Sequence, residues 1–204
     1  MNSLEAYRRL RELGVPVLET ADVATALQQS PFAASKTLSR LAAAGLIVPI
    51  RHGQFWVDGE LDPHRLPEYL TAPFPSYLSL QTALFVHGMI EQIPVVHYVS
   101  SLARTQRIRT KVGTFSVHHL MPELFGGFDI QDGVKLASPE KALFDVAYLS
   151  ATRTRLFSSL PELEIPKGFR PKRLEHWVQR IPSSRGRTIV ENKLSQFLVR
   201  AQVA

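Results

Sequence analysis

Cationic and hydroxyl side chains that could bind an anionic partner gather between residues 35 and 40. They are Ser35, Lys36, Thr37, Ser39 and Arg40. Ala34, Leu38 and Leu41 recur at the spacing i, i+4, i+7, which predicts a helix with a buried apolar stripe. The polar residues lie off that stripe, and Lys36 and Arg40 are one turn apart, so both can point into one groove. Arginine can pair with guanine through two hydrogen bonds and hydroxyls suit phosphate oxygens, so the pattern favours contact with nucleic acid.

The ends of this helix are also marked in the sequence. Ser30 is a typical N-cap residue, and Pro31 suits the first helical position because its missing N–H has no partner there. Gly45 is typical of the left-handed residue that ends a helix.

The elements around this helix predict the architecture that would position it. They are helices at 3–13 and 20–28 and strands at 46–50 and 54–57. Thr20 is the expected N-cap of the second helix, and Arg51, His52 and Gly53 form the turn between the strands. Three helices followed by a hairpin are typical of a winged helix-turn-helix, whose third helix enters the major groove. Arg51 and His52 at the tip of the wing are then expected to contact phosphates or the minor groove.

Two other interpretations of these residues stay open. Polar residues at such positions are expected on the solvated face of any surface helix. Some winged helices bind protein instead, and the balanced charge of residues 1–60, with six basic and six acidic side chains, is compatible with that role.

A proline-rich segment divides the chain. We predict a winged helix-turn-helix domain over residues 1–58, a linker over 59–76 and a second domain over 77–204. The second domain is expected to contain, in order, a helix at 79–86, a strand at 95–100, a hairpin of strands 106–109 and 114–120, a strand at 134–137 and helices at 138–149, 171–180 and 184–202. The fold class is therefore α+β, with a mixed α/β second domain that carries a small antiparallel sheet and terminal helices.

The second domain holds the basic excess of the protein. The whole chain has a net charge of +6, and residues 77–204 contain 17 basic and 10 acidic side chains. Part of this excess is a run made of Arg104, Arg107, Arg109 and Lys111. One hypothesis is that this patch contacts phosphates beside an operator, an RNA or an acidic protein. The alternative is a solvated edge strand whose charges prevent aggregation.

Sequence patterns for an enzyme or a cofactor site are not found. The chain has no cysteine, which excludes disulfides and thiolate metal ligands. The seven histidines show no tight metal-binding spacing, and there is no P-loop, dinucleotide fingerprint or nucleophile elbow. We therefore expect no catalytic residues, no metal and no cofactor. The N-terminus has no apolar leader and no apolar run is long enough to span a bilayer, so a cytoplasmic protein without membrane contact is expected.

The segment at the start of the helix at 138–149 contains carboxylates and a lysine, which are residue types found in catalytic sites. Ser138 and Pro139 begin the helix, and Glu140 in the first turn faces the positive end of the helix dipole. Lys141 and Asp145, at i and i+4, are expected to form a weak surface ion pair. A structural role, orienting the helix against the sheet, is favoured over a catalytic carboxylate, because no paired acid–base site is apparent.

Several segments carry a family resemblance. They are residues 77–84, 87–90, 92–94, 113–115 and 118–119, the sequence Ala-Ser-Pro-Glu-Lys-Ala-Leu-Phe-Asp at 137–145, and residues 45–53. Together they resemble the AbiEi family of antitoxins over most of residues 30–150. The resemblance implies an antitoxin of a type IV toxin–antitoxin system that counteracts a nucleotidyltransferase-like toxin. It also implies autorepression, with the N-terminal domain on double-stranded operator repeats and the C-terminal domain needed for antitoxicity.

Inverted operator repeats would be bound by two copies of the chain. The apolar stripe of the last helix could supply the contact between the copies, or it could pack within its own domain. Two further functions remain open: a stand-alone transcription regulator with a sensing domain, and an enzyme that modifies a toxin or a nucleotide through the C-terminal domain.

Overall fold

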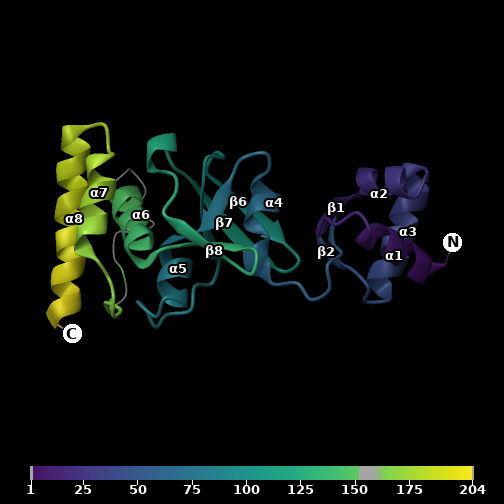
Figure 1. The fold of residues 1–204 in the computed structure, drawn as a ribbon, viewed down its shortest axis with the longest axis horizontal. Coiled ribbons are helices and arrows are strands. Elements are labelled where there is room, and N and C mark those ends of the chain that lie inside the picture. The colour runs from purple at the N-terminus through teal and green to yellow at the C-terminus, as the bar shows by residue number, and fades with distance from the viewer. Residues whose placement is uncertain (1, 152–159, 161, 204) are drawn as a thin grey trace. The chain divides into compact units, whose positions relative to one another are not determined.

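The computed structural model describes residues 2–151, 160 and 162–203, and its chain trace is drawn in Figure 1. The chain divides into two compact units. The N-terminal unit comprises Met1–Pro63 together with Arg109–Gly113, and the C-terminal unit comprises His64–Ile108 together with Thr114–Ala204. The fold is α+β, with a three-stranded antiparallel sheet in the first unit and a six-stranded mixed sheet in the second. The division at residue 63 falls inside the segment predicted as a linker, whereas the transfer of 109–113 to the N-terminal unit was not predicted.

The N-terminal unit contains three helices and a small sheet. Its elements are α1 (Ser3–Arg11), β1 (Val17–Glu19), α2 (Thr20–Ala26), α3 (Pro31–Ala43), β2 (Val48–Arg51) and β3 (Gln54–Trp56). The strand order is β1-β3-β2, with both pairs antiparallel. The predicted hairpin and helices are confirmed, whereas β1 is an additional strand that is too short to give an alternating pattern.

Local chemistry sets the ends of α3 as predicted. The Ser30 Oγ accepts a hydrogen bond from the Ala33 N–H at 3.3 Å, and Pro31 is the first helical residue. Gly45 follows the helix with a φ of +70°, a conformation that costs other residues more. The apolar face of α3 packs with residues of α1 and α2 in one core, represented by Leu10, Val23 and Leu38.

The prediction for the start of α2 is wrong. Glu19, the last residue of β1, is the N-cap, and Thr20 is the first helical residue. Asp22 accepts a hydrogen bond from the Glu19 N–H at 2.8 Å and completes a capping box. Because β1 runs directly into α2, its last residue Glu19 occupies the N-cap position, one residue before the threonine that was expected there.

The C-terminal unit contains the larger sheet. Its elements are α4 (Pro67–Thr71), β4 (Ser76–Leu78), α5 (Leu80–Val86), β5 (His97–Ser101), β6 (Gln106–Thr110), β7 (Gly113–His119), a 3₁₀ turn η2 (Pro122–Leu124), β8 (Phe128–Gln131), β9 (Val134–Ala137), α6 (Pro139–Ala151), α7 (Pro171–Gln179) and α8 (Ser184–Val203). A further 3₁₀ turn, η1 (Pro63–Arg65), lies at the junction with the N-terminal unit.

The expectation of a small antiparallel sheet in this unit is wrong. The order is β6-β7-β5-β4-β9-β8, and the β4–β9 and β5–β7 pairs are parallel. Two strands were not predicted: β4 is three residues long and wholly buried, and β8 is mostly exposed. Neither has the alternation of buried and exposed residues by which a half-buried strand is recognised in a sequence.

The three C-terminal helices belong to the core of this unit. In Figure 1, α7 and α8 lie beside α6, and the three helices contact one another. The apolar stripe of α8 is turned inward, since Val190, Leu194 and Phe197 are buried in the same cluster as residues of α6. Of the two roles considered for this stripe, packing within the unit is therefore the one observed.

We predict that the C-terminal unit loses stability when the pH falls from 6.5 towards 4. His118 in β7 is buried, and burial lowers its pKa from 6.5 to about 4. Between these values the unfolded chain binds a proton that the native state does not, so acidification favours unfolding by up to about 3 kcal/mol. The measurement is urea denaturation across this pH range.

The variant His118→Gln should reduce this pH dependence because it removes the titrating group. His119→Gln, which removes an exposed histidine from the same strand, is the matched control. An unchanged pH dependence in His118→Gln would show that the burial of His118 is not its cause.

Candidate nucleic-acid interface

The outer face of α3 carries most of the predicted contact residues. Ser35, Lys36, Ser39 and Arg40 are exposed, and the 13-residue helix contains no acidic side chain. In the part of the chain that the structure describes, no carboxylate forms an ion pair with Lys36 or Arg40. The positive charge of α3 is therefore available to an external anion.

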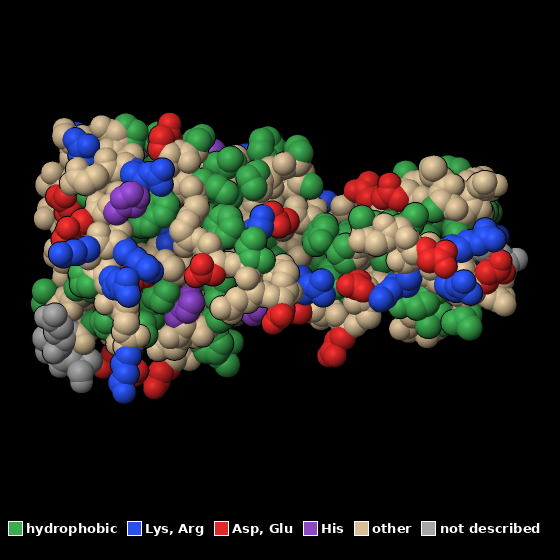
Figure 2. Space-filling model, viewed as in Figure 1, with side chains coloured by type: hydrophobic (Ala, Val, Ile, Leu, Met, Phe, Trp, Pro, Cys, Tyr) green, Lys and Arg blue, Asp and Glu red, His purple; other side chains and the backbone are tan. Residues whose placement is uncertain are grey.

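The arginines of α1 differ in this respect. Arg8 pairs with Glu12 at 3.1 Å, and Arg9 pairs with Glu5 at 3.3 Å. Figure 2 shows acidic and basic side chains interspersed over the visible face of the molecule. The two helices thus hold their cations differently: α1 neutralises Arg8 and Arg9 internally, and α3 does not neutralise Lys36 or Arg40.

The prediction that Thr37 lies on the exposed face is wrong. It is buried because it falls three residues after Ala34 and four before Leu41, which places it on the apolar stripe. Its Oγ1 donates to the Gln29 Oε1 at 3.1 Å and accepts from the Arg40 Nη2 at 3.4 Å. Thr37 is therefore a positioning residue that helps to orient Arg40, and it is not a surface contact.

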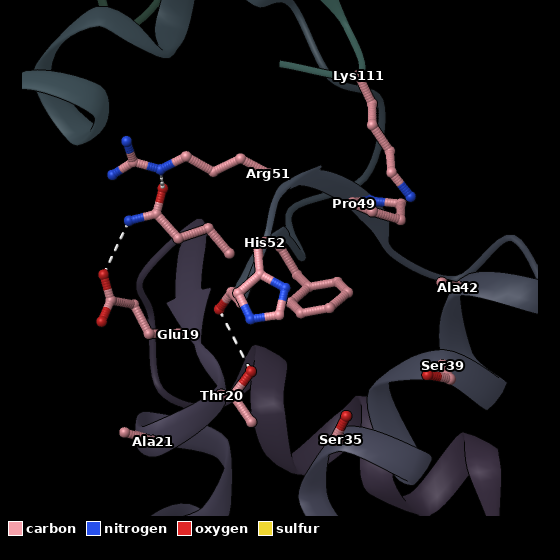
Figure 3. Close-up of a pocket in the computed structure, with 13 residues that line it drawn as sticks. Glu19, Thr20, Ala21, Ser35, Ser39, Ala42, Pro49, Arg51, His52 and Lys111 are labelled. Carbon is pink, nitrogen blue, oxygen red and sulfur yellow. Dashed lines mark hydrogen bonds between the residues drawn. The ribbon is translucent and has the colours of Figure 1, made fainter. Parts of the chain in front are cut away.

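A chain of hydrogen bonds orients the cation of the β2–β3 turn (Figure 3). The Arg51 Nε donates to the Gln54 Oε1 at 2.7 Å, and the Gln54 Nε2 donates to the Glu19 Oε1 at 2.8 Å. Gly53 has a φ of +74°, and its carbonyl oxygen accepts from the Thr20 N–H at 2.9 Å. This hydrogen bond ties the turn to the start of α2. Gln54 and Glu19 thus fix Arg51, and His52 beside it is exposed.

The predicted residues of α3 and the turn line two hollows in the surface of the N-terminal unit. Ser35, Ser39, Arg51 and His52 line the larger one, of about 950 Å³, together with Lys111 (Figure 3). The smaller, of about 620 Å³, is lined by Phe32, Lys36, Thr37 and Arg40 among others, and Ser35 and Ser39 line both. The structure therefore brings all seven residues predicted for this interface to one part of the unit.

The basic run of the second half is divided between the two units. Arg104 and Arg107 are exposed residues of the C-terminal unit, whereas Arg109 and Lys111 are exposed residues that cluster with the N-terminal unit. The Lys111 N–H donates to the Ile50 carbonyl oxygen at 2.8 Å, so the backbone of Lys111 is hydrogen-bonded to a β2 residue. Sequence alone could not reveal that Lys111 lies beside Arg51 and His52, because about 60 residues separate them.

The prediction of a surface ion pair between Lys141 and Asp145 is wrong. Both side chains are completely buried, and the Lys141 Nζ donates to the Asp145 Oδ1. Their spacing on α6 was identified correctly, but the helix is apolar on most of its circumference and is enclosed on several sides. A buried ion pair has a large desolvation cost, so it needs further hydrogen-bonding partners.

Three hydroxyl groups satisfy the other oxygen of Asp145. Its Oδ2 accepts from the Tyr77 hydroxyl at 3.0 Å, the Ser79 Oγ at 2.7 Å and the Ser100 Oγ at 3.1 Å. Burial, together with the nearby Asp145 charge, raises the pKa of Tyr77 well above its ordinary value, so this hydroxyl remains a donor. The cluster joins β4, β5 and the start of α5 to α6.

The start of α5 is shaped by the same cluster. Ser79 is the N-cap residue, but its side chain makes no capping hydrogen bond and is directed to Asp145 instead. Leu80 follows with a φ of +54°, a conformation that is strained for a leucine. The Ser79 N–H donates to the Tyr98 carbonyl at 3.1 Å, so contacts on both sides hold this turn.

Aromatic rings enclose the ammonium group of Lys141. Its Nζ lies 4.5 Å from the centre of the Trp177 ring and 4.9 Å from that of Phe144. Burial lowers the pKa of Lys141, and the carboxylate of Asp145 opposes part of that change. Gly127 has a φ of +72°, and a Cβ there would lie 2.6 Å from the Trp177 ring and 3.0 Å from Lys141, so only glycine fits without a rearrangement.

The other polar residues of the segment 137–145 hold the start of α6 in place. The Ser138 Oγ accepts from the Lys141 N–H at 3.3 Å, which confirms its predicted capping role, and Pro139 is the first helical residue. Glu140 is buried, and its Oε1 accepts from the Arg170 N–H at 2.7 Å. Glu140 therefore fastens α6 to the segment that precedes α7.

This cluster is sealed from solvent. Its five polar members, Tyr77, Ser79, Ser100, Lys141 and Asp145, are all fully buried, so none of them can touch a solute in this conformation. No site was predicted at Tyr77, Ser79 or Ser100. Tyr77 and Ser79 lie in a segment that carries the family resemblance, and Ser100 ends a predicted strand, but neither feature indicates a common partner.

Comparisons with known proteins give no assignment, because no family model and no curated protein matches the chain. Over the described residues, no three histidine or carboxylate side chains gather as metal ligands would. None of the helices within the described ranges is long and apolar enough to cross a membrane.

We predict that Asp145→Ala destabilises the C-terminal unit by about 3 to 5 kcal/mol, because it leaves the Lys141 ammonium group without its counter-charge. It also leaves three hydroxyl groups without their acceptor. The measurement is the urea midpoint followed by circular dichroism. Asp129→Ala, which removes an exposed carboxylate from β8, is the matched control, and equal effects of the two substitutions would contradict a structural role for the cluster.

Proposed function

We propose that the N-terminal unit is a winged helix-turn-helix that binds double-stranded DNA. In this proposal α3 enters the major groove, and the β2–β3 turn with Arg51 and His52 contacts the adjoining backbone or minor groove. The observation that carries the proposal is the unneutralised charge of α3, where Lys36 and Arg40 face solvent on a helix without an acidic residue. Such a face matches the negative charge of a duplex and gains from the release of its counterions.

The orientation of the cations supports the same proposal. Arg40 is held by the buried Thr37, and Arg51 is held by Gln54. An arginine that is already fixed loses less side-chain entropy when it pairs with a base or a phosphate. Lys111, which lines the same hollow as Arg51, would add a third phosphate contact from outside the predicted wing.

We further propose that the protein represses its own operon. A repressor of this kind reads inverted repeats with two copies of the chain, spaced by about one turn of the duplex. The duplex to test is therefore the DNA immediately upstream of the protein's own reading frame.

We predict that Lys36→Ala/Arg40→Ala weakens binding to this upstream duplex and flattens its salt dependence. Loss of two phosphate contacts in each of the two bound copies should reduce the slope of log K against log salt by about 3.6, since each contact contributes about 0.9. The measurement is fluorescence anisotropy at several salt concentrations, with a scrambled duplex for comparison.

The matched control for this experiment is Arg8→Ala/Arg9→Ala. It removes the same charge from the same unit, but from side chains that are already paired with Glu12 and Glu5. If both double variants lower the slope equally, a general charge effect replaces the specific role of α3. If the wild-type protein does not distinguish the upstream duplex from the scrambled one, the proposal of an operator-binding repressor is rejected.

We propose, from the resemblance to the AbiEi antitoxins, that the C-terminal unit counteracts a nucleotidyltransferase-like toxin. A stand-alone regulator with a sensing domain is the main alternative, and a toxin reading frame beside the gene favours the antitoxin. An enzymatic role for Lys141 or Asp145 is less favoured because both are sealed inside the unit. If substitution of either residue abolished an activity, a measurement of the fold would be needed to show that the loss did not come from unfolding.

We predict that co-expression of the full chain restores growth to cells that produce the neighbouring toxin from an independent promoter. Lys36→Ala/Arg40→Ala should restore growth equally well, because antitoxicity is assigned to the other unit. If this variant loses both rescue and operator binding while its fold is intact, antitoxicity depends on DNA binding. If the wild-type chain gives no rescue, the antitoxin role is rejected.

A further inference from the structure

One large apolar side chain stands among the polar groups of the outer face of α3. Phe32 is in the first turn of the helix and is 71% exposed. Its backbone is fixed by the neighbouring cap, where Pro31 begins the helix and Ser30 accepts from Ala33. The ring is therefore presented to solvent from a rigid part of the unit.

The surroundings of this ring are cationic. The Lys36 Nζ lies 4.6 Å from the ring centre, one helical turn further along α3. The hollow beside the ring is lined by Ser35, Ser39 and Arg40, and by no large apolar side chain other than Phe32 itself. An apolar protein partner would therefore bury several cations and hydroxyls together with the one ring, at a cost in desolvation.

The major groove of DNA offers a better match to this combination. Its edges are polar and its walls are phosphates, and the thymine 5-methyl group is the apolar group that it displays. A helix that enters the groove contacts base edges mainly with residues near its N-terminus, where Phe32 lies. Lys36, one turn later, is suited to a guanine or a phosphate on the next step.

We propose that Phe32 determines sequence specificity by packing against the 5-methyl group of a thymine in the major groove. This inference rests on the proposed DNA-binding function and extends it to a base. Lys36 leaves the ring when the duplex binds and directs its ammonium group to the neighbouring acceptor. Phe32 thereby exchanges contact with water for contact with the methyl group, and the recognised site must contain a thymine at that position.

The test uses the full chain and duplexes that it selects from a random-sequence pool, so no operator need be known. In the selected duplex each thymine is replaced singly by uracil, which lacks only the methyl group. For the wild-type protein, one such replacement in each half-site should weaken binding about fourfold, the effect of burying one methyl group. For Phe32→Ala the same replacement should have no effect, and Phe32→Leu should retain part of it.

Leu4→Ala is the matched control, because Leu4 is an equally exposed apolar residue of the same unit, 69% exposed on α1. It should leave the effect of uracil unchanged. If a sequence is selected but the uracil effect is absent, or persists fully in Phe32→Ala, the inference is overturned while the proposed function stands. If no sequence is enriched from the pool, the proposed function fails and the inference fails with it.

Discussion

The buried ion pair between Lys141 and Asp145 constrains how the C-terminal unit is packed. Two opposite charges inside a protein are tolerated only if their remaining hydrogen-bonding capacity is also satisfied. Here the second carboxylate oxygen collects hydroxyls from β4, β5 and the turn before α5, and the ammonium group is enclosed by aromatic rings, including that of Trp177 from α7. One carboxylate thus ties two strands and the turn before α5 to α6.

The N-terminal unit uses polar contacts for a different purpose. Its core is apolar, and its two buried polar side chains, Thr37 and Gln54, orient cations: Thr37 accepts from Arg40, and Gln54, which donates to Glu19, accepts from Arg51. If the proposed DNA binding holds, substitution of such a supporting residue alters it without removing any group that touches the duplex. The two units therefore differ in where their chemistry lies. In the first unit Lys36 and Arg40 are exposed, and in the second the polar cluster around Lys141 and Asp145 is enclosed.

This difference bears on how the proposed functions should be sought. If the buried cluster around Lys141 and Asp145 serves only to stabilise the C-terminal unit, any antitoxin activity resides on other residues, at the surface of the unit. In that case the exterior of the unit determines the partner that the proposed antitoxin recognises. The basic side chains Arg104 and Arg107 are on that exterior, whereas Lys111 is associated with the DNA-binding proposal for the other unit.

The sequence by itself determined the features that arise from contacts within a few residues. The limits of α3 follow from Ser30, Pro31 and Gly45, and the long helices follow from apolar periodicity, because caps and stripes are local. Tertiary structure decided what depends on residues distant in the chain: the parallel strand pairs, the common acceptor of three separated hydroxyls, and the placement of Lys111. It also decided burial, since a lysine and an aspartate at i and i+4 form the same pair on a solvated or an enclosed helix, and only the packing of the other elements makes this one a buried pair.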